Sequence, residues 1–213
     1  MAYIGKIPAA AAITASDLDP AVITGQTALA VAPADTDEFL ISDGGVLKRL
    51  DASLIGGGGK IGQVLQAVKT DTQNTTTDNT FTDVAGLTIA ITPSASNSKI
   101  LVLFTVNASA DTSDHVGIRL LRGSTDIFLG TNANAGQNVS AGYRNPDSDG
   151  NYDLANLCGQ FLDSPSTTSA TTYKIQAASN DEFFINRPHD ATGTTNMQRP
   201  FTASSITVME ILA

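Results

Sequence analysis

Strict alternation of apolar and polar residues dominates the chain after residue 60 and predicts β-strands, because side chains on a strand point to opposite faces in turn. Three runs are clearest, at 87–91, 100–106 and 116–120. Further expected strands lie at 61–68, 127–129, 153–162, 172–177, 183–185 and 205–211, with one short strand near Val139. Residues 70–80 are expected to form a polar loop. No segment predicts a helix longer than a turn or two.

The number and spacing of these strands indicate the fold class. About seven to nine short strands separated by turn signals are typical of an all-β, antiparallel β sandwich. Eight strands around two long loops, at 130–151 and 186–200, favour a jelly roll. We therefore expect one sandwich domain over residues 61–213.

The strand at 100–106 is apolar on both faces, since Leu101 and Leu103 face away from Ile100 and Val102. Such a strand needs cover on two sides. Either a thicker monomeric core or the axis of a homotrimer can supply the second cover. The sequence favours the trimer but leaves both alternatives open.

A hairpin is the clearest local signal before residue 56. Two β-rich runs, 38–42 and 46–50, flank a glycine-bearing loop of three residues, Asp43–Gly45. Residues 51–55 are expected to form a last helical turn. An isolated two-stranded hairpin is marginally stable in water, so this one should pack on a partner. The expected anchoring side chains are Phe39, Ile41, Val46 and Leu50.

The remaining residues near the start of the chain suggest how the hairpin is used. Residues 1–34 are apolar but broken by prolines, and they read as an extended segment that wraps over another surface. Four consecutive glycines, 56–59, resist helix and strand and predict a hinge. The expected organisation is an anchoring segment at 1–55 with its hairpin at 38–50, a hinge at 56–60, and the sandwich at 61–213.

Charge and composition remove several function classes. The formal net charge of the 213 residues is -9, with an excess of acidic groups both before and after the glycines. No basic stripe exists, so nucleic-acid binding is not expected. No apolar stretch approaches a membrane span. The first residues lack the pattern of a secretory signal. If the protein acts outside a cell, we expect it to leave by lysis or as part of a particle.

Catalytic chemistry is not visible in the sequence. Cys158, the single cysteine, is expected to be a small buried apolar residue. Neither histidine lies in a recognisable motif, and no nucleophile–base–acid set or pair of carboxylates can be placed, which argues against a hydrolase. The prediction is a protein that is not an enzyme and has no cofactor.

One loop places oxygen-bearing side chains at alternate positions, as calcium sites do. The candidates are Asp147, Asp149, Asn151 and Asp153. The loop departs from the EF-hand pattern, because its glycine comes one position early and Cys158 stands where the final glutamate belongs. A turn rich in Asp, Asn and Gly is the alternative reading.

Two loops hold candidate receptor contacts. Tyr143, Arg144 and Tyr152 lie in or beside the first long loop, and Arg187 and His189 in the second. Aromatic rings together with Asn and Asp can bind sugars by stacking and hydrogen bonding. The alternative is that both loops are solvated connections.

Residues 35–55 resemble a short module that recurs in tail-fibre and other virion proteins of tailed bacteriophages. The later part resembles phage proteins with a jelly roll like that of the complement and tumour-necrosis-factor families. The matching segments are 117–122, 161–165, 171–175 and 206–210. The resemblance covers most of the chain through short motifs in a shared order.

This resemblance implies a structural virion protein of a tailed phage, a short fibre, a head fibre or a decoration protein. Such a protein is made in the host cytoplasm and is carried outside the cell in the virion. It also implies a homotrimer, anchored to capsid or tail through residues 1–55, whose displayed β domain could contact a glycan or protein of the host surface. A stand-alone lectin-like carbohydrate-binding module is the alternative.

Overall fold

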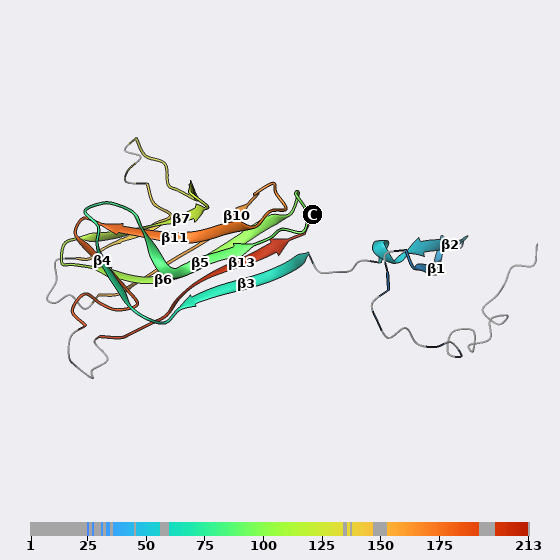
Figure 1. Ribbon diagram of the computed structural model, residues 1–213, viewed down its shortest axis with the longest axis horizontal. Coiled ribbons are helices and arrows are strands. Elements are labelled where there is room, and N and C mark those ends of the chain that lie inside the picture. Colours follow the sequence, from blue (N-terminus) through green and yellow to red (C-terminus); the bar gives the residue numbers. More distant parts are fainter. Residues whose placement is uncertain are drawn as a thin grey trace, which may run out of the picture. The chain divides into compact units, whose positions relative to one another are not determined.

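The chain divides into two compact units, Met1–Gly57 and Gly58–Ala213, which are described separately here. The structure is a computed structural model (Figure 1). It describes Gly25, Thr27, Val31, 33–34, 36–44, 46–55, 60–133, Gly136, 138–146, 153–191 and 199–212. The glycine hinge expected at 56–60 and the wrapping segment expected at 1–34 lie largely outside the described residues.

The small unit contains the predicted hairpin. Strands β1 (Glu38–Asp43) and β2 (Val46–Asp51) pair antiparallel, and the 3-10 turn η2 (Ala52–Leu54) confirms the expected helical turn. The predicted three-residue loop is wrong, because Asp43 itself pairs with Val46 and two residues connect the strands. Gly44 has a φ of +58°, which the tight two-residue hairpin turns require and glycine adopts without strain.

The large unit is an antiparallel β sandwich, which confirms the predicted fold class (Figure 1). The first sheet has the order β3-β13-β6-β12-β4, with β10 on the other edge of β6. The second sheet has the order β5-β11-β7-β8, with β9 beside β8 on the same edge of β7. The strands are β3 (Ile61–Lys69), β4 (Gln73–Thr76), β5 (Thr82–Ile91), β6 (Lys99–Ala110), β7 (His115–Arg122), β8 (Thr125–Ile127), β9 (Ala141–Arg144), β10 (Ala155–Asp163), β11 (Thr171–Ser179), β12 (Glu182–Ile185) and β13 (Ser204–Ile211).

The long strands alternate between the sheets along the chain, as in a jelly roll. The chain passes from β3 in the first sheet to β5 in the second, back to β6, across to β7, and so on to β13. β3 and β13 pair side by side, although they are the first and last strands of the domain along the chain.

None of the described helices is long and apolar enough to cross a membrane.

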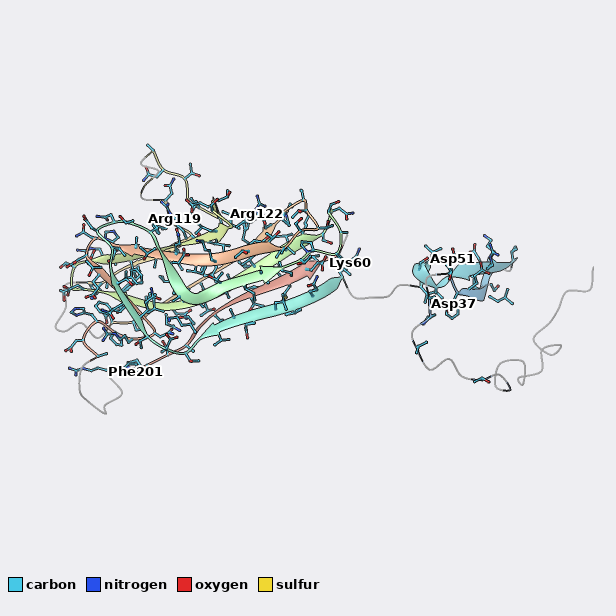
Figure 2. All side chains as sticks on the ribbon, viewed as in Figure 1. Asp37, Asp51, Lys60, Arg119, Arg122 and Phe201 are labelled. Atoms are coloured by element: carbon cyan, nitrogen blue, oxygen red, sulfur yellow. The ribbon has the colours of Figure 1, made fainter. Side chains whose placement is uncertain are left out.

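The core fills the space between the two inner faces (Figure 2). The inner side chains of β6 and of β7 are almost fully buried, which is the alternation that the sequence pattern predicts. One ionic cluster crosses from sheet to sheet inside it. The hydroxyl of Tyr173 donates to Asp163 Oδ2 at 2.6 Å, and Arg122 Nη1 donates to both oxygens of the same carboxylate at 2.8 and 2.9 Å.

Three sequence expectations differ from the structure. The segment 70–80, expected to be a polar loop, contains β4, whose Gln, Asn and Thr side chains give no apolar signal. The short strand expected near Val139 begins two residues later, at Ala141. Cys158 is exposed rather than buried, because it pairs with Thr105 and so points to the outer face of the first sheet.

Candidate functional site

A hollow lies on the outer face of the second sheet of the sandwich. Its floor is a row of three small residues, Ala178 in β11, Gly117 in β7 and Gly142 in β9. Gly117 pairs directly with each of the other two, and direct cross-strand partners point to the same face. The sheet is exposed there only at Gly142, because Val139 and the Phe81 ring cover Gly117, and Ala178 is buried. We call this feature the outer hollow; its volume is about 640 Å³.

Val139 explains why glycine is needed in the floor. A Cβ atom on Gly117 would lie 2.7 Å from Val139 Cγ1, and one on Gly142 would lie 3.5 Å from Val139 Cγ2. The first distance is shorter than real Cβ contacts allow. The loop before β9 can therefore press Val139 onto the sheet only because Gly117 lacks a side chain.

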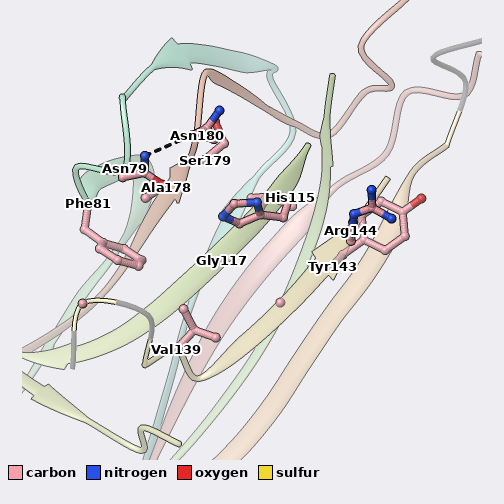
Figure 3. Close-up of a pocket in the computed structure, with 13 residues that line it drawn as sticks. Asn79, Phe81, His115, Gly117, Val139, Tyr143, Arg144, Ala178, Ser179 and Asn180 are labelled. Carbon is pink, nitrogen blue, oxygen red and sulfur yellow. Dashed lines mark hydrogen bonds between the residues drawn. The ribbon is translucent and has the colours of Figure 1, made fainter. Parts of the chain in front are cut away.

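The next cross-strand row supplies two nitrogen-rich side chains. His115 in β7 pairs directly with Arg144 in β9, and both point to the outer face beside the floor (Figure 3). The side chains of Asn79, Asn180 and Phe81 complete the wall, and the Asn79 amide donates to Asn180 Oδ1 at 3.2 Å.

Arg119 connects the Phe81 ring to the loop before β9. Its guanidinium carbon lies 3.8 Å from the centre of the Phe81 ring, a cation–π contact. Its Nε donates to the carbonyl of Asn138 at 2.9 Å and its Nη2 to that of Gly136 at 3.2 Å. One arginine thus connects the ring before β5 to the loop before β9, and this fixes both sides of the outer hollow.

The electrostatics of the outer hollow differ from those of the whole protein. Among its described lining residues the ionisable groups are His115, Tyr143 and Arg144, and none is a carboxylate. Arg144 makes no hydrogen bond with the described residues, whereas His115 Nδ1 lies 3.3 Å from Asp114 Oδ1. Burial, and then the nearby charge of Asp153, raise the pKa of the Tyr143 phenol, so the phenol is neutral. The lining is therefore cationic or neutral, with the Asp114 carboxylate behind His115.

The structure brings together some of the predicted site residues. Tyr143 and Arg144 are both lining residues of the outer hollow, but only Arg144 points to the outer face, because Tyr143 pairs with the buried Val116 and packs against the core. Tyr152, Asp147, Asp149 and Asn151 lie outside the described residues, so the predicted calcium loop stays a prediction. Its one described member, Asp153, lies near Tyr143. The described part of the chain contains no group of three His, Cys, Asp or Glu side chains suited to a metal.

The other two receptor candidates lie elsewhere. The Arg187 guanidinium lies 4.7 Å from the centre of the Phe184 ring, and the His189 ring meets the same ring edge-on at 4.8 Å. Both side chains therefore pack on a buried phenylalanine of β12, and neither is among the residues of the outer hollow. A contact with a receptor stays a prediction for them.

Sequence reasoning missed His115, Phe81 and the glycine floor. The available signal was a glycine, Gly117, inside an otherwise well-formed strand, which often marks a close approach of another segment. Which segment approaches depends on the pairing of β9 with β7, and no local pattern encodes that pairing.

The outer face of the first sheet is a second candidate surface. Cross-strand partners place Leu162, Leu101, Met209 and Val64 in one row across β10, β6, β13 and β3. The adjacent rows add further apolar and neutral polar side chains, namely Gln160, Leu103, Thr207 and Gln66, then Cys158, Thr105, Ser205 and Val68. We call these three rows the apolar rows. They contain no charged side chain.

The four anchor residues predicted in the hairpin share one face. Phe39 pairs with Leu50, while Ile41 and Val46 follow at positions of the same face along β1 and β2. Phe39 and Val46 are exposed, 41% and 59%, in the isolated unit. The register thus places the four predicted anchors on one face together with Asp43 and Lys48, whereas the exposed Leu40 lies on the opposite face.

Comparisons with known proteins identify no family for this chain. No family model and no curated protein matches the chain. Among solved structures, it is similar to VP2 of infectious bursal disease virus in a subviral particle, with 9% identity, a TM-score of 0.41, and coverage of 83% of this chain and 38% of that one. For the Gt strain of the same virus the values are 11%, 0.38, 80% and 41%. The chain spans less than half the length of either structure. At TM-scores this low, the likeness says nothing about what this chain binds or where it acts.

Proposed function

We propose that this protein is a non-enzymatic structural protein of a phage virion. In this proposal it forms a homotrimer, is anchored to the particle through residues 1–55, and displays the sandwich toward the host surface. The observation that supports the proposal most strongly is the set of apolar rows on the first sheet. The sequence resemblance to virion proteins of tailed phages supplies the biological setting.

The apolar rows suit contact between copies of this chain. Val64, Val68 and Leu162 are 55%, 53% and 47% exposed, which is unusual for three apolar side chains on one sheet face. Copies of a protein with a net charge of -9 repel one another over most of their surfaces. The apolar rows hold no carboxylate and so avoid that repulsion, and burying their apolar side chains gives a favourable free energy. Closed rings of identical copies are the usual result of such contacts.

The hairpin supports the anchoring role. Its two strands would be marginal alone, and its apolar face needs a surface to cover it. Surface ion pairs, Lys48 with Asp43 and Arg49 with Glu38, contribute little stability. In the proposal the particle supplies the missing cover, and Phe39, Ile41, Val46 and Leu50 contact it.

The oligomeric state tests the first part of the proposal. Light scattering of the full chain should give about 66 kDa, three times the 22.0 kDa of one copy. Val64→Asp places a charge in the apolar rows and should give the monomer mass. Phe201→Asp is the matched control, because Phe201 is 63% exposed but lies outside the rows. A monomeric wild-type chain, or a trimeric Val64→Asp variant, would contradict the proposed interface.

The rate at which the Cys158 thiol is modified tests the same contact between copies independently. The thiol lies in the apolar rows and is exposed in a single copy. A maleimide should therefore modify the Val64→Asp variant quickly and the wild-type trimer slowly. Equal rates in the two proteins would mean that the rows are not covered.

Removal of residues 1–55 tests the anchoring role and separates it from a lectin-like module, which the outer hollow favours as a second candidate function. A virion protein without this segment should keep its folded sandwich but no longer enter particles. A stand-alone lectin should keep all of its binding activity and have no particle to enter. Incorporation of the shortened chain into particles would refute anchoring through residues 1–55.

A further inference from the structure

We propose that the outer hollow binds a carboxylated sugar of the hexuronic acid type. This inference rests on the proposed attachment role and specifies the class of ligand that the displayed sandwich contacts. It follows from three observations on the lining residues: the paired His115 and Arg144, the Phe81 ring beside two amides, and the lack of carboxylates among the described lining residues.

The His115–Arg144 pair is an arrangement suited to an anion. Direct cross-strand partners have Cβ atoms roughly 5 Å apart, so both side chains can reach one small group between or above them. The Arg144 guanidinium carries several N–H donors and makes no hydrogen bond with the described residues. A carboxylate fits its planar fork of donors, and His115, whose Nδ1 faces Asp114 Oδ1 at 3.3 Å, can add an N–H from its other nitrogen.

The remaining lining residues suit the body of a sugar. Gly142, the exposed end of the floor, leaves space beside Val139, and the Phe81 ring offers an apolar wall (Figure 3). Asn79 and Asn180 supply amide donors and acceptors beside it. A mostly preformed cavity with an apolar wall and a few polar groups is the usual design of a small-ligand site, and 640 Å³ is within the range of such sites.

The contacts of Arg119 hold the outer hollow in one arrangement before any ligand binds. Arg119 fixes the Phe81 ring and the loop that carries Val139, so the wall does not have to order itself when a ligand binds. Arg119 also has a carboxylate partner, since its Nη1 lies 3.2 Å from Asp126 Oδ2. Arg144, not Arg119, is therefore the cation assigned to the ligand.

The test is ligand-observed NMR of the full chain with sodium glucuronate. D-glucose, which lacks the carboxylate, and sodium acetate, which lacks the sugar, serve as comparisons. Glucuronate should bind, glucose should bind at least tenfold more weakly, and acetate should fail to displace glucuronate at equal concentration. Glucose that binds as tightly as glucuronate, or acetate that displaces it, would overturn the assignment, as would no binding of glucuronate or galacturonate.

Three variants connect any binding to the outer hollow. Arg144→Gln keeps a polar side chain but removes the charge and should weaken glucuronate binding about tenfold, the loss expected for one charge-assisted hydrogen bond. Phe81→Leu should weaken binding by removing the flat ring while keeping an apolar side chain. Lys60→Gln removes one exposed positive charge at the start of β3, away from the outer hollow, and should change nothing (Figure 2).

The failure of this inference can be told apart from failure of the proposed function. A chain that forms trimers and enters particles but does not bind glucuronate is a virion protein without this ligand. Unchanged glucuronate binding in Arg144→Gln would place the ligand elsewhere and overturn the assignment. The melting temperature of each variant, compared with that of wild type, shows whether a loss of binding is local.

Discussion

Acid should destabilise the sandwich through the buried carboxylate of Glu210. This side chain is 1% exposed and points from β13 into the domain. Its Oε1 accepts hydrogen bonds from the backbone N–H and the hydroxyl of Ser94, both at 2.6 Å, and its Oε2 accepts one from the Gln63 amide at 2.8 Å. The carboxylate therefore joins β3 and β13 of the first sheet to the segment that follows β5 of the second.

The pKa of Glu210 gives the size of the effect. Burial by itself raises the pKa, but the hydrogen bonds from Ser94 and Gln63 outweigh it and bring the pKa from 4.5 to about 2. At about 1.4 kcal/mol per pKa unit, this difference corresponds to about 3 kcal/mol of stability. A depressed pKa stabilises the folded state above pH 4.5, and the contribution is lost as the pH falls toward 2. By pH 3 about 2 kcal/mol of it should be gone.

Urea unfolding of wild type and Glu210→Gln across pH 2.5–7, at one protein concentration, measures this contribution. The variant should be less stable at pH 7, because its side-chain NH2 faces the Gln63 NH2 and the carboxylate is lost. The difference should shrink steadily below pH 4.5. Glu182→Gln, at a half-exposed position, is the matched control. Parallel stability curves for wild type and Glu210→Gln would refute the reasoning.

Two further substitutions test the packing of the sandwich by chemical unfolding. Tyr173→Phe removes the hydroxyl that donates to Asp163 and should lower the free energy of unfolding by about 2 kcal/mol, the usual cost of losing a hydrogen bond to a buried charge. An unchanged denaturation midpoint would mean that Arg122 alone satisfies this carboxylate. Gly159→Ala would place a Cβ atom 2.5 Å from Phe104 Cζ, and this overpacking should lower the free energy of unfolding by about 2 kcal/mol. Gly136→Ala, whose new Cβ would have no atom within 4 Å, should leave the free energy of unfolding unchanged. Equal effects of the two alanines would contradict the close contact at Gly159.

The pattern of alternation was sufficient to predict the fold class and most strands, because burial of one face imposes a two-residue period on any strand of a sandwich. The hairpin was predicted from a different signal, two β-rich runs around a glycine-bearing loop, and the anchoring role of Phe39, Ile41, Val46 and Leu50 stays a prediction. The pattern does not report burial on the second face. Cys158 shows this limit: its place in a strand was predicted, but only the pairing of β10 with β6 decides that it points outward.

The candidate site shows the same division. The sequence by itself indicated Tyr143 and Arg144 as candidate contacts, because they flank a long polar loop. Only tertiary structure placed Arg144 opposite His115 and Gly117 opposite Gly142. These pairs join residues about 25 positions apart along the chain, and their register depends on packing between sheets rather than on any local preference. The sequence determined which residues form strands, and the tertiary structure decided which of them meet.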